Sequence, residues 1–160
     1  MNTQRSVSTV AAWLLVVGLC GGLGWGAAPA LGASDTLVIP LSGKVTLAAD
    51  AVPLVGVAKI VSELLPGDAT TPPGVLLSIR LLSGGGTGAR GTRYAAIAEV
   101  QRVRVLSATD VVEITVPVYP LVPGGINKAE RALVTFTLSL DPTTGLLNSG
   151  TGKLATANFQ

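Results

Sequence analysis

The chain has 160 residues and contains 11 Lys or Arg, 9 Asp or Glu and no histidine, which gives a net charge of +2. So small a charge excess provides no basic surface for phosphate backbones, and we expect no nucleic-acid partner. The absence of histidine excludes every catalytic triad and zinc site that depends on imidazole.

Residues 1–33 have the pattern of a secretory signal peptide. Arg5 is the only charge before a long apolar stretch, which ends in the small residues GAAPALGA. This order of regions predicts cleavage after Ala30 or Ala33 and a secreted or periplasmic protein. A retained membrane anchor is the alternative, because the uncharged stretch is long enough to span a bilayer. We expect contact with a membrane only in that case.

The predicted mature domain, residues 34–160, lacks several reactive residue types. Both tryptophans, the only cysteine (Cys20) and the only methionine precede it. The domain therefore has no thiol for a disulfide, a nucleophile or a metal. Its carboxylates are scattered, although Asp68 or Asp141 could contribute to a loop calcium site. We predict no catalytic residue, no metal site and no cofactor.

Apolar residues recur at every second position through this domain, which is the period of half-buried strands. The pattern predicts strands at residues 36–41 and 43–49, either separate or as one strand broken near Pro40, and at 52–64, 75–82, 131–140 and 146–159. Turn residues occupy 66–74 and 141–145.

Residues 92–121 predict a β-hairpin that turns at Ala108 and Thr109. This register puts Arg104 opposite Glu113, with Arg102 on the same face and β-branched residues on the other. A change in the alternation predicts a β-bulge near residues 101–102. Arg102, Arg104 and Glu113 form a candidate polar contact face, for which a solvated sheet surface is the alternative.

The stretch GTGARG, residues 86–91, matches the G-x-G-x-x-G dinucleotide fingerprint. A genuine fingerprint follows a fully buried parallel strand and opens a helix. Here Arg80 gives the preceding strand a solvated face, and the following segment has the pattern of a strand. We therefore interpret residues 84–91 as a glycine-rich hairpin loop, with Arg90 and Arg93 as candidate loop contacts.

Seven or eight antiparallel strands predict an all-β fold, either a β-sandwich or a small closed or partly open barrel. We expect an exported, non-enzymatic domain of the bacterial envelope or exterior. It would bind a protein partner or self-associate through sheet edges. One alternative is a small barrel that carries an apolar ligand, with room left by Ala95, Ala96 and Ala98. A second is a secreted carboxylate-dependent hydrolase.

Overall fold

The computed structural model of the protein describes residues 35–48 and 50–157. The predicted signal peptide and its cleavage sites lie outside this range. The strands and the single 3-10 helix are β1 (Thr36–Thr46), β2 (Ala51–Leu65), β3 (Gly74–Thr87), β4 (Arg93–Ala96), β5 (Glu99–Val105), β6 (Thr109–Pro120), η1 (Gly125–Lys128), β7 (Glu130–Leu140) and β8 (Leu147–Thr156).

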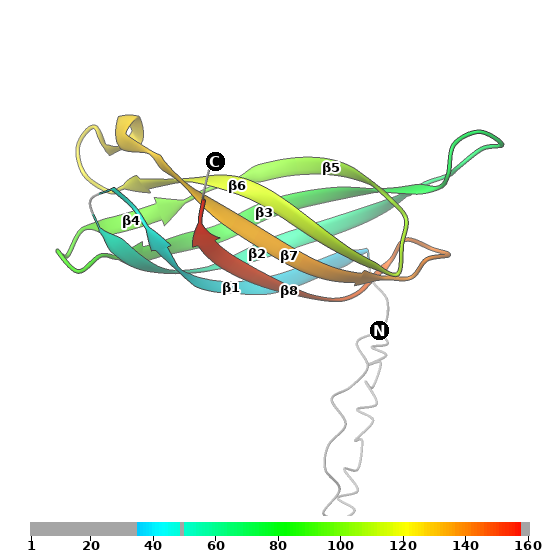
Figure 1. Ribbon diagram of the computed structural model, residues 1–160, viewed down its shortest axis with the longest axis horizontal. Coiled ribbons are helices and arrows are strands. Elements are labelled where there is room, and N and C mark those ends of the chain that lie inside the picture. The colour runs from blue at the N-terminus through cyan, green and yellow to red at the C-terminus, as the bar shows by residue number, and fades with distance from the viewer. Residues whose placement is uncertain (1–34, 49, 158–160) are drawn as a thin grey trace, which may run out of the picture.

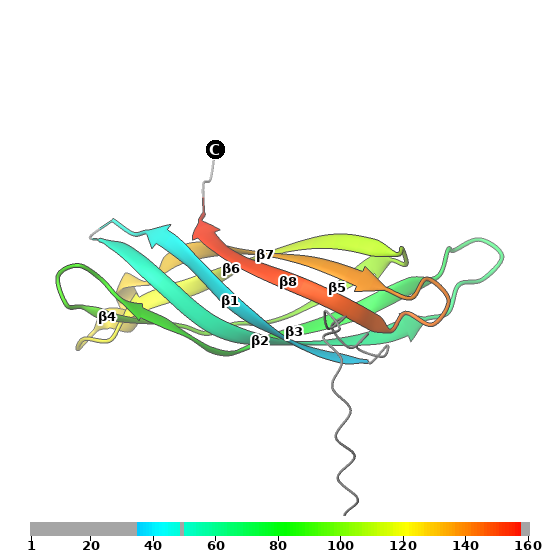
Figure 2. The same ribbon diagram turned by 90° about the horizontal axis from the view of Figure 1, so that it is seen from below.

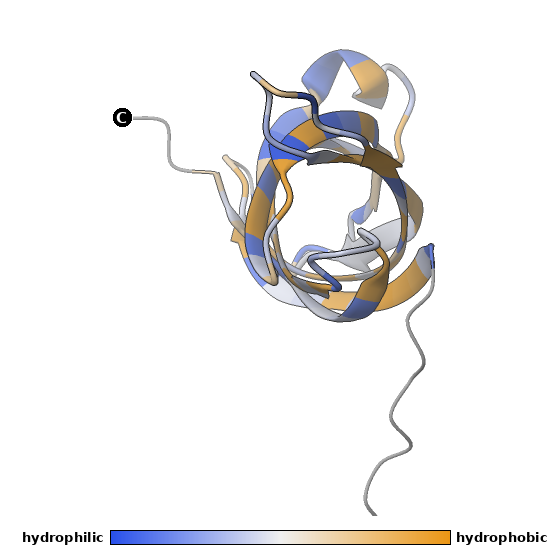
Figure 3. Cartoon of the chain, turned by 90° about the vertical axis from the view of Figure 1, so that its right-hand side faces the viewer, coloured by the Kyte–Doolittle hydropathy of each residue, from blue (hydrophilic) through white to orange (hydrophobic). Residues whose placement is uncertain are grey.

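Seven strands close into a barrel, and β5 is an outer strand attached to it (Figure 1). The ring follows the order β2-β1-β8-β7-β6-β4-β3 and closes through the pairing of β2 with β3. The predicted all-β class is therefore confirmed in its barrel form, and the sandwich expectation is wrong. The view along the barrel axis in Figure 3 shows the ring directly.

One pairing in the barrel is parallel. Residues Leu41, Ser42 and Gly43 of β1 lie beside Gly152, Lys153 and Leu154 of β8. The two strands run side by side with their arrowheads at the same end (Figure 2). This pairing joins the first strand to the last, and it departs from the fully antiparallel sheet that the sequence predicted.

The barrel interior is filled by apolar side chains from alternate strand positions. Phe136, Leu138, Ile60 and Leu77 are among the side chains that are fully buried there. Phe136 fits because it is paired with Gly152, where an added Cβ would collide with Leu41 and contact the Phe136 ring. The interior is thus a packed core, as expected when a small barrel closes.

Pro40 does not break the first strand, which runs continuously from Thr36 to Thr46. The amide of Ser62 donates to the carbonyl of Asp35, so odd-numbered residues of β1 direct their backbone groups toward β2. Pro40 therefore faces β8, one residue before the β1–β8 pairing begins at Leu41. A residue without an N–H is tolerated where no ladder bond is made.

The glycine-rich stretch belongs to an antiparallel hairpin between β3 and β4. Residues 84–86 lie within β3, and the tip is the shorter segment 88–92, with Gly91 at φ 80°. The predicted hairpin is confirmed, although its loop is shorter than the sequence suggested. Because both flanking elements are strands, the stretch lacks the helix of a dinucleotide site.

The predicted pairing of the hairpin at residues 92–121 is wrong. β5 pairs along β3, from Gly74–Val105 to Arg80–Glu99, whereas β6 pairs with β7 and, near its end, with β4. The interruption between β4 and β5 falls at residues 97–98, before the bulge predicted at 101–102. The alternation of side chains in β5 is compatible with pairing to β3 or to β6. In the structure β5 pairs with β3, and Ala98, Val100 and Leu106 pack against the core.

Candidate functional site

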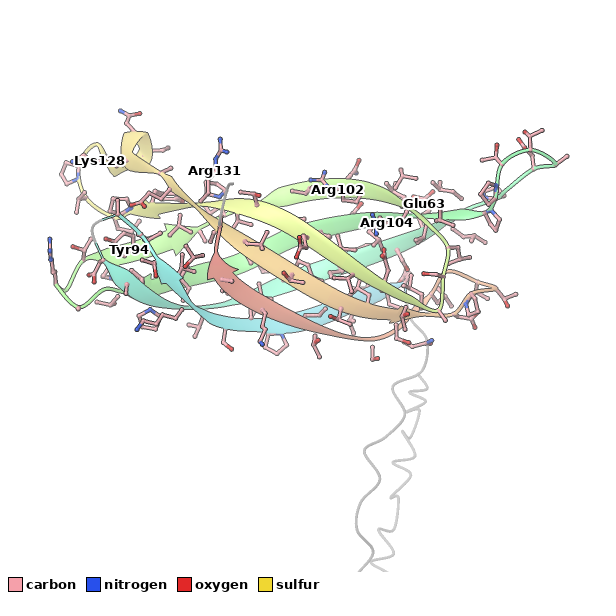
Figure 4. The ribbon with its side chains drawn as sticks, viewed as in Figure 1. Glu63, Tyr94, Arg102, Arg104, Lys128 and Arg131 are labelled. Carbon is pink, nitrogen blue, oxygen red and sulfur yellow. The ribbon has the colours of Figure 1, made fainter. Side chains whose placement is uncertain are left out.

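The three residues of the predicted polar face are not brought together. Arg102 and Arg104 both come from β5 (Figure 4), in phase with the core-packed residues Val100 and Leu106. Glu113 lies on β6, where it accepts a hydrogen bond of 3.3 Å from the Thr135 hydroxyl. The predicted contact of Arg104 with Glu113 is therefore absent, because β5 and β6 do not pair in the expected register.

Arg104 instead binds Asp110, which the predicted hairpin register places opposite Ser107. Nε of Arg104 donates to Oδ2 of Asp110, and Nη2 donates to Oδ1, each at 2.8 Å. The Asp110 side chain is only 12% exposed, against 44% for Arg104. These hydrogen bonds to a carboxylate raise the pKa of the Arg104 guanidinium. In the sequence, the pair could have been found from two opposite charges that are six residues apart on either side of a short connection.

Arg102 has no such partner. Its Nη1 donates at 3.1 Å to the backbone carbonyl of Gln101, its own neighbour. The ion pairs seen between two described residues join Arg80 to Glu99 and Arg104 to Asp110. The cation of Arg102 is thus left without a carboxylate beside a strand edge.

No strand in the described part of the chain pairs with that edge. The amide of Leu106 donates to the carbonyl of Pro73, and the amide of Leu81 donates to the carbonyl of Ala98. Even-numbered residues of β5 therefore direct their N–H and C=O toward β3. Because these directions alternate along an antiparallel strand, the odd-numbered residues direct theirs away from β3. These residues are Glu99, Gln101, Val103 and Val105.

β6 presents a second free edge. The amide of Leu140 donates to the carbonyl of Ala108, so the backbone N–H and C=O groups of even-numbered residues in β6 point toward β7. The backbone groups of Val111, Glu113 and Thr115 consequently point away from β7, toward the side where β4 is paired further along. We call the interval between residues 99–105 of β5 and residues 109–117 of β6 the seam.

The seam is held at both ends in one register. At one end β4 pairs with β6, with Tyr94 opposite Pro120 and Ala96 opposite Val118. If the register of the β4–β6 pairing is continued into β5, Arg104 lies opposite Asp110. The salt bridge joins these two residues. The middle of the seam has no strand pairing in the described chain.

The outer side of the seam carries exposed valines among polar residues. Val103 and Val105 of β5 are each 67% exposed, and Val111 of β6 is 55% exposed. An exposed strand with free backbone groups and β-branched side chains is a ready template for another strand. The seam therefore combines backbone donors and acceptors, exposed valines on its outer side and one cation, Arg102, without a carboxylate.

The second pair of predicted contacts, Arg90 and Arg93, lies at the β3–β4 hairpin. The backbone amide of Arg90 donates at 3.3 Å to Oδ2 of Asp50, which holds the hairpin tip against the β1–β2 connection. Arg93 lines an open groove of about 660 Å³ on the outer wall, together with Val55, Gly85 and residues near them. The two arginines share a hairpin but are not joined into one anion site by any contact between them.

The carboxylates with shifted pKa values serve the backbone of turns. Hydrogen bonds from the amides of Arg90, Thr70 and Thr143 lower the pKa values of Asp50, Asp68 and Asp141 respectively. Residues 35–48 and 50–157 contain no group of three or more His, Cys, Asp or Glu placed to bind one ion, at Asp68, Asp141 or elsewhere. These aspartates cap turns.

Comparisons with family models, curated proteins and solved structures gave no match. No helix among the described residues is long and apolar enough to cross a membrane.

Proposed function

We propose that this is an exported, non-enzymatic protein that binds or assembles with other polypeptides by accepting an extended strand at β5. The observation that carries the proposal is the free edge of β5. This strand has β3 on one side, and four of its residues direct backbone N–H and C=O groups to the other side. Backbone pairing of this kind gives affinity, and alternate side chains give specificity.

The alternatives have less support. A carrier of an apolar ligand needs interior volume, but Phe136, Leu138 and their neighbours fill the barrel. A carboxylate-dependent hydrolase needs two convergent carboxylates, whereas Asp50, Asp68 and Asp141 each bind the backbone of a turn. Export is argued from the apolar, small-residue pattern of residues 1–33.

Selection of peptides against the purified protein tests the proposal. A phage library of random decapeptides is selected on the protein and then measured on the Val103→Pro variant. The Val103 amide points to the free edge, so proline removes one donor from that edge without removing a bond to β3. We expect the selected peptides to bind the variant about tenfold more weakly.

Val103→Ala is the matched control, because it shortens the same side chain and keeps the amide. The selected peptides should bind it more tightly than they bind Val103→Pro. Thermal unfolding of both variants verifies that the barrel is intact. A library that yields no binder, or binders indifferent to Val103→Pro, would contradict strand addition at β5.

A further inference from the structure

We infer that the strand accepted at β5 carries an acidic side chain opposite Arg102 and apolar side chains opposite Val103 and Val105. This inference rests on the proposed function and specifies the partner. It starts from the one cation in the seam that lacks a carboxylate. Arg102 is an exposed residue in phase with the core-packed Val100, and its guanidinium binds only the carbonyl of Gln101.

The groups that face Arg102 offer no counter-charge. Across β3 its partner is Leu77, which is fully buried. Across the seam, the register of the Arg104–Asp110 pair puts Val112 opposite Arg102, and Val112 is buried as well. The nearest inward carboxylate on β6 is Asp110, and both of its oxygens accept hydrogen bonds from Arg104.

An added strand would meet two different surfaces. Its alternate side chains on the inner side would lie beside Arg102, and those on the outer side beside Val103 and Val105, each 67% exposed. Directly opposed side chains on one face of a sheet interact, and opposite charges are favourable there. A glutamate or aspartate opposite Arg102 and β-branched residues opposite Val103 and Val105 therefore complement the edge. The incoming backbone would also take the Gln101 carbonyl that Arg102 now covers.

A second copy of this chain is a poor occupant. When two β5 edges pair antiparallel about a two-fold axis near residues 101–103, Arg102 lies directly or diagonally opposite Arg102 or Arg104 of the other copy. Like charges in those positions destabilise the pairing. The charge pattern thus favours a different polypeptide with acidic side chains.

Three fluorescent peptides of one length test the inference: TVEVEVEVT, TVQVQVQVT and TVKVKVKVT. Anisotropy gives their affinities for the protein at low salt. We expect the glutamate peptide to bind about tenfold more tightly than the glutamine peptide, and the lysine peptide to bind most weakly. Arg102→Glu should reverse the order of the glutamate and lysine peptides. Lys44→Glu, an equal charge change at an exposed site on β1, should preserve it.

The outcomes separate the inference from the proposed function. Equal binding of the three peptides would overturn the acidic preference and leave strand addition standing. Failure of all three, when library-selected peptides still depend on the Val103 amide, would overturn the inference alone. A symmetric dimer abolished by Val103→Pro would identify the occupant as a second copy and also overturn it. An unchanged unfolding temperature of Arg102→Glu would show that its altered peptide preference does not come from loss of the fold.

Discussion

The guanidinium of Arg104 and the carboxylate of Asp110 form two hydrogen bonds of 2.8 Å across the seam between β5 and β6. Because the two residues are opposite each other in the register of the β4–β6 pairing, this salt bridge keeps β5 aligned with a strand to which it is not paired. At this end the backbone of β5 pairs with β3, and side chains join the strand to β6.

Replacement of Asp110 by Asn should loosen this end of the seam. The carboxylate is only 12% exposed and binds in a bidentate manner, so we expect a loss of about 1 kcal/mol in the free energy of unfolding. Urea denaturation measures the loss, and hydrogen exchange should quicken at β5 amides. Glu113→Gln, which disturbs only a 3.3 Å contact with Thr135, is the control. An equal loss of unfolding free energy in both variants would mean that the salt bridge does not stabilise the protein more than the contact of Glu113 does.

Stability should fall on acidification but not near neutral pH. The pKa values of Asp50, Asp68 and Asp141 are lowered from 3.8 by backbone hydrogen bonds. Their unfolded pKa values are therefore higher than their folded ones, and the unfolded chain binds more protons as pH falls. Stability should be constant from about pH 8 to 5 and decline below about pH 4.

Urea midpoints measured across this range check the pH dependence. The chain has no histidine, so no imidazole titration should appear near pH 6. Asp50→Asn should lower stability at neutral pH and make the acid decline shallower, because its bond to the Arg90 amide is weakened. A decline that began well above pH 5 would contradict the assignment.

Gly152→Ala should destabilise the barrel. An added Cβ at this position would collide with Leu41 and lie 3.3 Å from the ring of Phe136, which is fully buried. Overpacking of this kind costs about 1–3 kcal/mol. Thr151→Ala, an exposed neighbour on the same strand, should cost less than about 1 kcal/mol. Thermal unfolding distinguishes the two, and equal losses would show that Gly152 is not required for the packing of Phe136.

Ser62→Ala should stabilise the protein. Ser62 is 5% exposed, and its hydroxyl has no hydrogen-bond partner. An unsatisfied buried hydroxyl costs about 1–3 kcal/mol, so removing it should raise the unfolding temperature by several degrees. Ser42→Ala, at an exposed position of β1, should leave the temperature unchanged. A lower unfolding temperature for Ser62→Ala would mean that the hydroxyl is satisfied in solution.

The positions of the strands could be predicted from the sequence, because side chains on a half-buried strand alternate. β2 and β7 extend from Ala51 to Leu65 and from Glu130 to Leu140, within one residue of the predicted ends. The partners of the strands could not be predicted in the same way. The alternation of side chains shows which residues of β5 lie on the same face. It does not show whether β3 or β6 is the neighbouring strand.

The candidate site was only partly predictable for the same reason. Arg102 and Arg104 were selected because charges alternate with valines, and both lie at the free edge. Asp110 was missed as their neighbour because the assumed turn paired it with Ser107. A shift of three residues in the register exchanges Glu113 for Asp110 as the partner of Arg104, and local turn chemistry was too weak to decide between them.

The parallel junction of β1 with β8 has a consequence for how the protein folds. Near this junction the amide of Thr46 donates to the hydroxyl of Thr156, across 110 positions of the sequence. Contacts between such distant residues form late, because the entropy of closing the intervening chain must be overcome first. The ring therefore cannot be completed until β8 has been synthesised, and we expect the meeting of the first and last strands to slow folding.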